Sequence, residues 1–362
     1  MIIKRRKSRE IKVGNVKIGG GAPISIQSMT KTDTRDVIKT VHQIKELEKA
    51  GCQIVRVAVK DMDAAKAISG IKSRIDIPLV ADIHFDYKLA LLAIQSGADK
   101  IRINPGNMTR HQEVEAVVHA AKSYRIPIRI GLNSGSVIKH AGKSVADAMV
   151  SSALSYIKLF EKLKFDDIII SLKASSVPET VEAYRRIAKK CSYSLHLGIT
   201  AAGLPDDGRI KSAVGIGALL FDGIGDTIRV SLTADPVVEV LAAKQILEAA
   251  GIASFGLQII SCPTCGRCQV DLVKIGEELK EKLGYQRTSH QSQLMTGNWR
   301  IGAPIKIALM GCEVNGPGEA KDVDIGLAAG KNSGMLFKKG KPIRKIAEKD
   351  FVKVLLEEIN KI

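Results

Sequence analysis

Aromatic side chains are scarce in this sequence: they make up 4% of 362 residues, and only one of them is a tryptophan. Surfaces that bind single-stranded nucleic acid usually stack bases on aromatic rings, so the scarcity argues against such a surface. Acidic residues are also in deficit, with 38 aspartates and glutamates against 55 lysines and arginines. The resulting net charge of +17 attracts nucleic acids, phosphorylated metabolites and acidic proteins without choosing among them.

Long hydrophobic runs are absent as well. The basic first ten residues, MIIKRRKSRE, are not followed by an apolar stretch, so we expect neither a signal peptide nor a membrane span. We interpret these residues as a solvated arm and expect a cytoplasmic protein. Six cysteines in a chain that can bury a full core make stabilising disulfides unnecessary.

The cysteines are instead spaced for an inorganic centre. Cys262, Cys265 and Cys268 stand three residues apart within SCPTCGRCQVDL, and Cys312 follows in GCEVNGPGEA. Short loops with this spacing let several thiolates converge on one metal or cluster. A structural zinc ion is the alternative, but it usually takes two pairs of ligands, whereas here a triplet faces a single cysteine. The spacing therefore favours an iron–sulfur cluster.

Short β-branched runs alternate with amphipathic segments up to residue 253. The segment 37–51, for example, has apolar residues at helical spacing and ends at a glycine. Eight strand–helix units predict an α/β fold, a closed parallel (β/α)8 barrel of the TIM type. An open doubly wound sheet is the alternative, but no glycine-rich dinucleotide loop follows the first strand. The expected strands are residues 24–27, 54–59, 79–83, 100–104, 128–133, 168–173, 195–200 and 227–232.

Four of the expected strands carry an arginine between β-branched neighbours. Because side chains alternate along a strand, these arginines should face the barrel interior and their neighbours the helices. An unpaired buried guanidinium is costly, so four of them need anions. Asp82 or other acids could neutralise some, but a phosphorylated ligand would supply the remaining negative charge. The four residues are Arg56, Arg102, Arg129 and Arg229.

Polar residues stand at or near the ends of the expected strands. Active sites of TIM barrels lie at the carboxyl ends of the strands, so these residues are candidates for the same site. They are Asp82, His84, Asn104, Asn133, Lys173 and Ser231.

From residue 256 the alternation gives way to a smaller mixed unit. Strands are expected at 306–310, 324–328 and 334–337, and segments 272–283 and 348–362 have the periodicity of amphipathic helices. We therefore predict two domains, residues 1–255 and residues 256–362.

Eight motifs occur along the chain in the order ADIHFD, RINPGN, RIGLNSGS, SLKAS, LHLGIT, GIGDTIRVSL, CPTCGR and GCEVNGPGEA. Together these motifs resemble the bacterial hydroxymethylbutenyl diphosphate synthase family of the non-mevalonate isoprenoid pathway. The resemblance covers essentially the whole chain. It implies an oxidoreductase that converts 2-C-methyl-D-erythritol 2,4-cyclodiphosphate to 4-hydroxy-3-methylbut-2-enyl diphosphate by reductive ring opening and dehydroxylation.

The resemblance also implies a C-terminal α+β domain similar to sulfite and nitrite reductases, which holds a 4Fe-4S cluster. Two electrons would arrive singly from flavodoxin or ferredoxin, both acidic proteins that suit a basic surface. Members of the family form head-to-tail homodimers in which the cluster of one chain caps the barrel of the other. We expect no binding to nucleic acid or to membranes.

Site residues follow from the resemblance position by position. The family's cluster ligands fall on Cys262, Cys265, Cys312 and Glu319, replacing the all-cysteine site that spacing alone suggests. A carboxylate leaves iron more readily than a thiolate, which would open a position for substrate. The family's diphosphate contacts fall on Arg56, Arg102, Arg129, Asn133, Lys173 and Ser231, and further active-site positions on Asp82, Asn104 and Arg229.

One departure from the family bears on catalysis. The family reads T-E-A-G after its seventh strand, and the glutamate is thought to handle a proton, whereas this chain has alanine at 201. Alanine cannot transfer a proton. We therefore expect a protein that binds substrate and cluster but has a low catalytic turnover, because Ala201 stands at the position of the family's glutamate.

Two other functions would use part of the same features. A cluster-bearing regulator would bind nucleic acid through the basic surface, with an affinity that falls steeply with salt. A pterin-binding barrel that transfers a group from a phosphorylated substrate would use the arginines and leave the cysteines without a role.

Overall fold

The computed structural model describes residues 3–104, 108, 110–137, 144–283, 305–312, 314, 318 and 322–362. The chain divides into two compact units, residues 1–253 and residues 254–362. In the part of the chain that is described, no helix is both long and apolar enough to cross a membrane.

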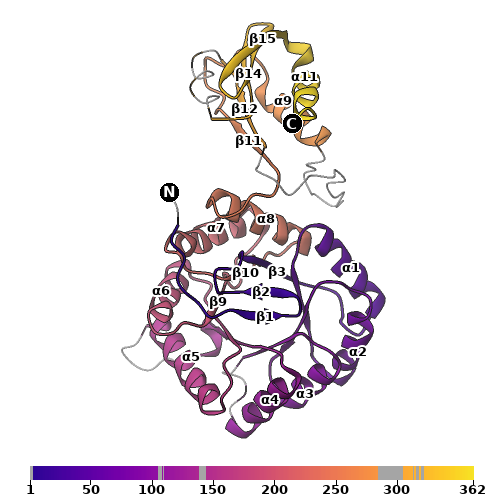
Figure 1. Ribbon diagram of the computed structural model, residues 1–362, viewed down its shortest axis with the longest axis vertical. Coiled ribbons are helices and arrows are strands. Elements are labelled where there is room, and N and C mark those ends of the chain that lie inside the picture. The colour runs from indigo at the N-terminus through magenta and orange to yellow at the C-terminus, as the bar shows by residue number, and fades with distance from the viewer. Residues whose placement is uncertain are drawn as a thin grey trace. The chain divides into compact units, whose positions relative to one another are not determined.

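The first unit is a closed barrel of eight parallel strands inside a ring of helices, which confirms the predicted α/β barrel (Figure 1). Hydrogen-bonded neighbours run in the order β10-β3-β4-β5-β6-β7-β8-β9 around the barrel. The strands are β3 (Ser25–Met29), β4 (Ile54–Ala58), β5 (Leu79–Ile83), β6 (Lys100–Ile103), β7 (Ile128–Asn133), β8 (Ile168–Lys173), β9 (Ser194–Leu197) and β10 (Thr227–Ile228). The last two are shorter than the sequence predicts.

The helices alternate with these strands. They bury the apolar face that their periodicity predicts; in α1, for example, Val41, Ile44 and Leu47 are buried, and Asp36 caps the first turn by accepting a hydrogen bond from the Lys39 N–H at 3.0 Å. The helices are α1 (Val37–Lys49), α2 (Met62–Lys72), α3 (Tyr87–Gln95), α4 (His111–Tyr124), α5 (Val145–Lys162), α6 (Val177–Ala188), α7 (Pro205–Phe221) and α8 (Pro236–Ala249), with a short 3-10 turn η1 (Ser134–Ser136) after β7.

A hairpin that the sequence analysis did not predict closes the amino-terminal end of the barrel. Strands β1 (Ile11–Val13) and β2 (Val16–Ile18) pair antiparallel and lie across the ring in Figure 1. Their side chains pack in one cluster with interior residues near the starts of β4, β5 and β8. This apolar floor leaves the opposite end of the barrel, where the strands end, for polar side chains. The cluster contains Ile11, Val13, Ile18, Ile54, Val80 and Ile169.

The basic residues before the hairpin are bound to the barrel, so the prediction of a solvated arm is wrong. Arg5 donates to the Ala22 carbonyl at 2.5 Å, and Arg6 donates to the Cys191 carbonyl at 2.7 Å. Both guanidinium groups also lie within 3.7 Å of the buried carboxylate of Asp226. The acceptors are carbonyl groups and a buried carboxylate from distant parts of the chain, which a charged donor binds strongly.

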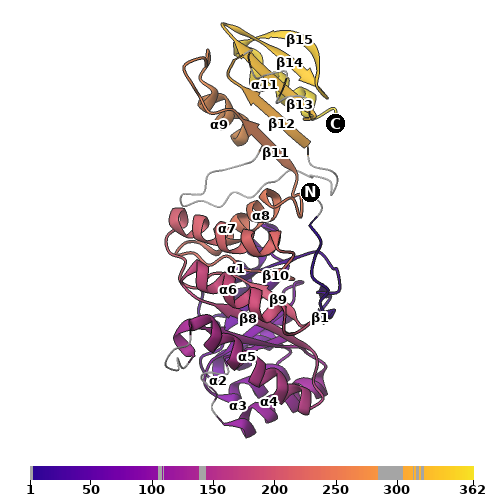
Figure 2. The same ribbon diagram turned by 90° about the vertical axis from the view of Figure 1, so that its left-hand side faces the viewer.

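The second unit is a five-stranded sheet with helices packed on it (Figure 2). The first three strands are parallel and the last two pairings antiparallel. Strand β15 was not predicted, and the final helix begins at residue 351, after a 3-10 turn, rather than at 348. The elements are β11 (Leu257–Ser261), α9 (Leu272–Lys282), β12 (Ile305–Met310), β13 (Ile325–Gly330), β14 (Ser333–Lys338), β15 (Lys341–Ala347), η2 (Glu348–Asp350) and α11 (Phe351–Ile359).

Truncation of the floor should destabilise the barrel. Ile18 is fully buried, so Ile18→Ala removes apolar contacts and leaves a cavity, and we expect the free energy of unfolding to fall by about 2–5 kcal/mol. The control is Ile38, which is 75% exposed on α1. Ile38→Ala should change the free energy of unfolding by less than about 0.5 kcal/mol. Urea unfolding measures both, and equal effects of the two changes would contradict the assignment of the hairpin as a packed floor.

Candidate active site

The barrel interior holds more cations than acids. The described interior contains six cationic side chains, each 12% exposed or less, and one carboxylate that is 5% exposed, while a second carboxylate, 2% exposed, approaches from helix α8. The four arginines predicted to face inward are among them, which confirms the side-chain alternation along their strands. The cations are Arg56, Lys100, Arg102, Arg129, Lys173 and Arg229, and the acids are Asp82 and Glu239.

Asp82, at the end of β5, binds cations from the two neighbouring strands. Its Oδ1 accepts a hydrogen bond from Arg102 Nη1 at 3.0 Å, and its Oδ2 lies 3.8 Å from Arg56 Nε and 3.4 Å from His84 Nε2. Burial by itself would raise the pKa of this carboxyl, but the charge of Arg56, and then that of Arg102, holds it well below its ordinary value. Asp82 is therefore ionised and neutralises one positive charge of this group.

Glu239, which the sequence analysis missed, is the second acid. It lies in the first turn of α8, 3.6 Å from Arg229 Nη2 and 3.3 Å from Lys31 Nζ. It also accepts hydrogen bonds from the Leu232 N–H at 3.0 Å and the Ser28 hydroxyl at 3.3 Å. Burial, followed by the charge of Arg56, lowers the pKa of Arg229 to about 10, and Glu239 opposes that shift. The only sequence signal for this role was an acidic residue on an otherwise apolar helix face.

Three interior cations have no acid within ion-pair distance among the described residues. Arg129 Nε and Nη1 are buried without a hydrogen-bond partner, and Lys100 Nζ reaches only the Gln27 amide oxygen at 3.3 Å. Burial first, and then the neighbouring arginines, lower the pKa values of Arg129, Lys100 and Lys173 well below their ordinary range. The protein's own carboxylates thus neutralise only part of the cationic interior.

Two glycines let the cationic side chains pass close to the backbone. A Cβ at Gly131 would lie 2.5 Å from Arg102 Nε, and a Cβ at Gly198 would lie 2.8 Å from Lys173 Nζ. Any larger residue would push these cations from their present positions. Both glycines therefore belong to the architecture of the site, although the sequence analysis did not single them out.

The predicted polar residues lie at the carboxyl ends of the strands. Asn104 is buried after β6, Asn133 is partly exposed at the end of β7, and Ser231 is partly exposed three residues after β10. Ser136 joins the first two, because its hydroxyl donates to the Asn104 amide oxygen at 3.3 Å and to the Asn133 backbone carbonyl at 2.9 Å. These hydrogen bonds hold the Asn104 amide and the Asn133 backbone beside the cationic interior.

Ala201 lies in the connection between β9 and α7 and is exposed. Its backbone φ of 49° is in the left-handed region, which costs a residue with a Cβ about 1–2 kcal/mol. The conformation is as unfavourable for glutamate as for alanine. The loop shape therefore does not explain why alanine stands here.

The cysteines of the second unit gather at the ends of neighbouring parallel strands. Cys262 follows β11, and its N–H donates to the Leu309 carbonyl at 3.1 Å, while Cys312 follows β12 and is buried. The Gly311 N–H donates to Cys262 Sγ at 3.2 Å, the kind of contact that stabilises a thiolate ligand. This donor set fits a cluster bound by thiolates.

The remaining cysteines of the set are placed differently. Cys265 is exposed, whereas the Cys268 thiol donates to the Val270 carbonyl at 3.2 Å and packs directly against Gly311. Within the described ranges, no three cysteine, histidine or acidic side chains are arranged to hold a metal ion. Glu319, the predicted fourth ligand, lies outside the described residues.

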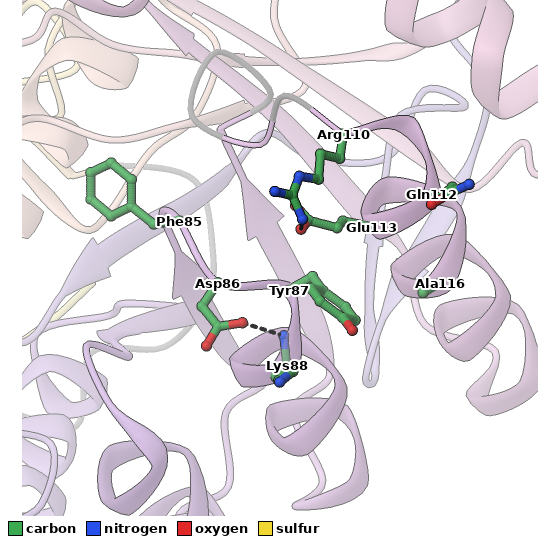
Figure 3. A pocket seen from close by; sticks show the side chains of 8 residues that line it. All are labelled: Phe85, Asp86, Tyr87, Lys88, Arg110, Gln112, Glu113 and Ala116. Carbon is green, nitrogen blue, oxygen red and sulfur yellow. Dashed lines mark hydrogen bonds and ion pairs between the residues drawn. The ribbon is translucent and has the colours of Figure 1, made fainter.

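An open cavity of about 620 Å3 lies apart from the cationic interior, between the starts of α3 and α4 (Figure 3). Arg110 and Glu113 pair across 3.8 Å at its edge, and Asp86 caps α3. None of the predicted site residues lines it. The lining residues are Phe85, Asp86, Tyr87, Lys88, Arg110, Gln112, Glu113 and Ala116.

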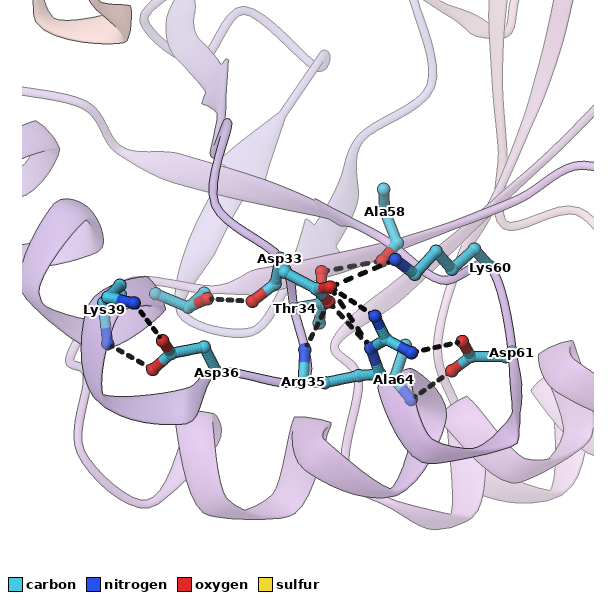
Figure 4. A network of polar contacts seen from close by, with 10 residues as sticks. Asp33, Thr34, Arg35, Asp36, Lys39, Ala58, Lys60, Asp61 and Ala64 are labelled. Atoms are coloured by element: carbon cyan, nitrogen blue, oxygen red, sulfur yellow. Dashed lines mark hydrogen bonds and ion pairs between the residues drawn. The ribbon is translucent and has the colours of Figure 1, made fainter.

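Exposed ion pairs tie together the loops that follow β3 and β4 (Figure 4). Asp33 accepts from Arg35 at 2.6 Å and from Lys60 at 3.1 Å, and the Thr34 hydroxyl donates to the Ala58 carbonyl at 2.7 Å. Hydrogen bonds from Arg35, then from Lys60, hold the pKa of Asp33 below its ordinary value. These solvated contacts shape the rim next to Arg56.

Removal of an unpaired interior cation should stabilise the ligand-free protein. The pKa of Lys100 is depressed in the folded chain, so the unfolded chain binds more protons, and the unfolding free energy should rise as pH increases from 7 toward 10. Lys100→Met should raise stability at pH 7 and flatten this rise. Urea unfolding at several pH values measures both effects. The control is Lys66→Met, which changes a side chain that is 65% exposed. If the unfolding free energy rose with pH by the same amount in the Lys100 and Lys66 variants, the expectation would be contradicted.

Comparison with known proteins accounts for both units. Residues 8–244 match the GcpE TIM-barrel domain, and residues 258–361 match the GcpE protein C-terminal domain. The chain is 55% identical to the 4-hydroxy-3-methylbut-2-en-1-yl diphosphate synthase (flavodoxin) of Caldanaerobacter subterraneus subsp. tengcongensis, over 100% of this chain and 99% of that protein. It is 53% identical to the Clostridium perfringens protein of the same name, over 99% and 100%.

Similarity to solved structures is confined to the fold. An N-acetylneuraminic acid synthetase from Leptospira borgpetersenii serovar Hardjo-bovis has a TM-score of 0.50 and 14% identity, over 78% of this chain and 100% of that one. A Xanthomonas albilineans dihydropteroate synthase in complex with 7,8-dihydropteroate has the same score and identity, over 68% and 100%. The full-length relatives decide the matter: the chain is an oxidoreductase of the GcpE family, the family of the 4-hydroxy-3-methylbut-2-en-1-yl diphosphate synthases.

Proposed function

We propose that this protein converts 2-C-methyl-D-erythritol 2,4-cyclodiphosphate to 4-hydroxy-3-methylbut-2-enyl diphosphate by reductive ring opening and dehydroxylation. The observation that carries the proposal is the surplus of buried cations over acids inside the barrel. A diphosphate supplies negative charge where the protein's own carboxylates do not. The flavodoxin in the names of the relatives supports an acidic flavodoxin as electron donor to this basic chain.

Within the proposal, residues 1–255 bind the substrate. Arg129 and Lys173, which have no carboxylate partner in the described interior, contact the diphosphate. Arg56 on β4 and Arg102 on β6 approach it from the two strands beside β5. Each charge-assisted hydrogen bond contributes about 1.5–3 kcal/mol. The amide of Asn133 and the hydroxyl of Ser231 complete the contacts, and Asp82, Asn104 and Arg229 complete the pocket.

Residues 256–362 hold the redox centre in this proposal. Cys262, Cys265 and Cys312 with Glu319 bind a 4Fe-4S cluster, which supplies low-potential electrons one at a time. The Gly311 N–H at Cys262 Sγ supports ligation by stabilising the thiolate. Substrate and cluster meet in a head-to-tail homodimer, so that each complete site draws on two chains.

Ala201 sets the expected rate of the reaction. The methyl side chain of alanine can neither hold a proton nor hydrogen-bond a substrate hydroxyl. We infer that substrate binding is retained, because the cations and amides that hold it are in place, and that the step that needs a proton is slow.

Anaerobic reconstitution with iron and sulfide tests the proposed function. We expect a coloured protein whose electron paramagnetic resonance spectrum, after reduction, changes when the cyclodiphosphate is added, and slow formation of product with reduced flavodoxin. Cys262→Ser should lose the cluster, whereas Cys191→Ser, outside the proposed ligand set, should keep it. A colourless zinc protein that is indifferent to the cyclodiphosphate would overturn the proposal.

Restoration of a carboxyl group at residue 201 should increase turnover. General acid–base catalysis contributes about 100-fold to 10000-fold, and both residues share the cost of the left-handed backbone, so we expect Ala201→Glu to raise kcat within that range. Ala201→Gln, which adds the same volume without a transferable proton, is the control. If both the Glu and the Gln variant had the same kcat as the parent protein, this position would not limit turnover.

A further inference from the structure

His84 follows β5 at the carboxyl end of the barrel and contacts two charged residues through one ring nitrogen. Its Nε2 lies 2.8 Å from Arg102 Nη1 and 3.4 Å from Asp82 Oδ2. The side chain is 42% exposed, so the ring can exchange protons with solvent. The centroid of the Phe85 ring lies 6.0 Å from that of the imidazole.

The two contacts of Nε2 require opposite protonation states. A guanidinium can only donate hydrogen bonds, so the contact with Arg102 requires Nε2 to be a free acceptor and the ring to be neutral. An ionised carboxylate can only accept, so the contact with Asp82 requires a proton on Nε2. Asp82 is ionised, as its cationic neighbours show. The contact with Arg102 is the shorter of the two.

Arg102 is the partner that an anion can draw away. It donates to Asp82 Oδ1 at 3.0 Å and to the Gly131 carbonyl at 2.9 Å, while its Nε has no hydrogen-bond partner in the described barrel. A phosphate oxygen is a stronger acceptor than a neutral imidazole nitrogen, because both partners of that contact are charged. The same anion reduces the repulsion between an imidazolium and its cationic neighbours, Arg102 on β6 and Arg56 on β4, which lies 3.8 Å from Asp82 Oδ2.

We propose that His84 takes up a proton when a diphosphate binds in the barrel. Arg102 turns Nη1 toward the anion, and His84 Nε2 binds a proton and donates a hydrogen bond to the Asp82 carboxylate. One N–H bond forms on His84, the proton comes from a solvent or buffer acid, and Arg102 keeps its own protons. The inference rests on the proposed binding of a diphosphate. It places a solvent-exchangeable proton at the barrel mouth of a chain in which residue 201 cannot hold one.

Calorimetry with inorganic diphosphate tests the uptake in the full-length protein. Titrations at pH 7 in buffers with different ionisation enthalpies give the number of protons bound with each ligand. We expect His84→Gln to lose a large part of the proton uptake that the parent protein shows. The control, His42→Gln, changes a side chain 76% exposed on α1 and should keep the full uptake.

A spectroscopic measurement covers the case in which His84→Gln does not fold. In protein labelled at the histidine rings, diphosphate should shift one imidazole signal to the position of an imidazolium, and His42→Gln should leave that signal in place. This proposal alone would be overturned if diphosphate bound without producing a new imidazolium signal. It would also be overturned if the parent protein and His84→Gln took up equal numbers of protons. An absence of diphosphate binding to the parent protein would overturn the proposed function as well.

Discussion

An excess of positive charge inside a closed barrel is the constraint on which the rest of this structure depends. Buried guanidinium and ammonium groups lose hydration, and only two carboxylates face them in the described interior. The apolar floor, where the β1–β2 hairpin packs on Ile54, Val80 and Ile169, supplies stability that the polar half of the barrel lacks. The molecule thus separates the apolar part of the barrel, which stabilises the fold, from the part that carries the surplus of positive charge.

The two carboxylates determine which cations are available to a ligand. Asp82 draws Arg102 and Arg56 together at the ends of β4, β5 and β6, and Glu239 holds Arg229 against α8. Arg129, Lys100 and Lys173 have no carboxylate partner among the described residues, and the proposed function assigns Arg129 and Lys173 to the diphosphate. A site with this arrangement is organised before the ligand arrives, so less binding energy is lost in ordering side chains.

Both units place their reactive groups at the same kind of location. Polar side chains end the parallel strands of the barrel, and Cys262 and Cys312 follow the adjacent parallel strands β11 and β12 of the second unit. Neighbouring parallel strands bring the residues that follow them to one edge of a sheet. Groups that are about fifty residues apart in sequence can therefore converge there. Membership of the GcpE family gives the two arrangements a common purpose, the reductive chemistry proposed above.

Sequence by itself determined the features that depend on local regularity. Alternation along a strand was enough to direct Arg56, Arg102, Arg129 and Arg229 inward, and the repeat of strand and helix was enough to predict the closed barrel. Spacing also predicted a cysteine ligand set, and the structure brings two of its members, Cys262 and Cys312, to the ends of the adjacent strands β11 and β12.

Only the tertiary structure decided which charges meet. Glu239 reaches Ser28, 211 positions away along the chain, because α8 packs beside β3, and Lys100 reaches Gln27 across the barrel. The basic N-terminal segment binds carbonyl groups and Asp226 for the same reason. A local pattern gives the direction of a side chain, but the partner depends on strand register and helix packing, which bring together residues that are distant in sequence.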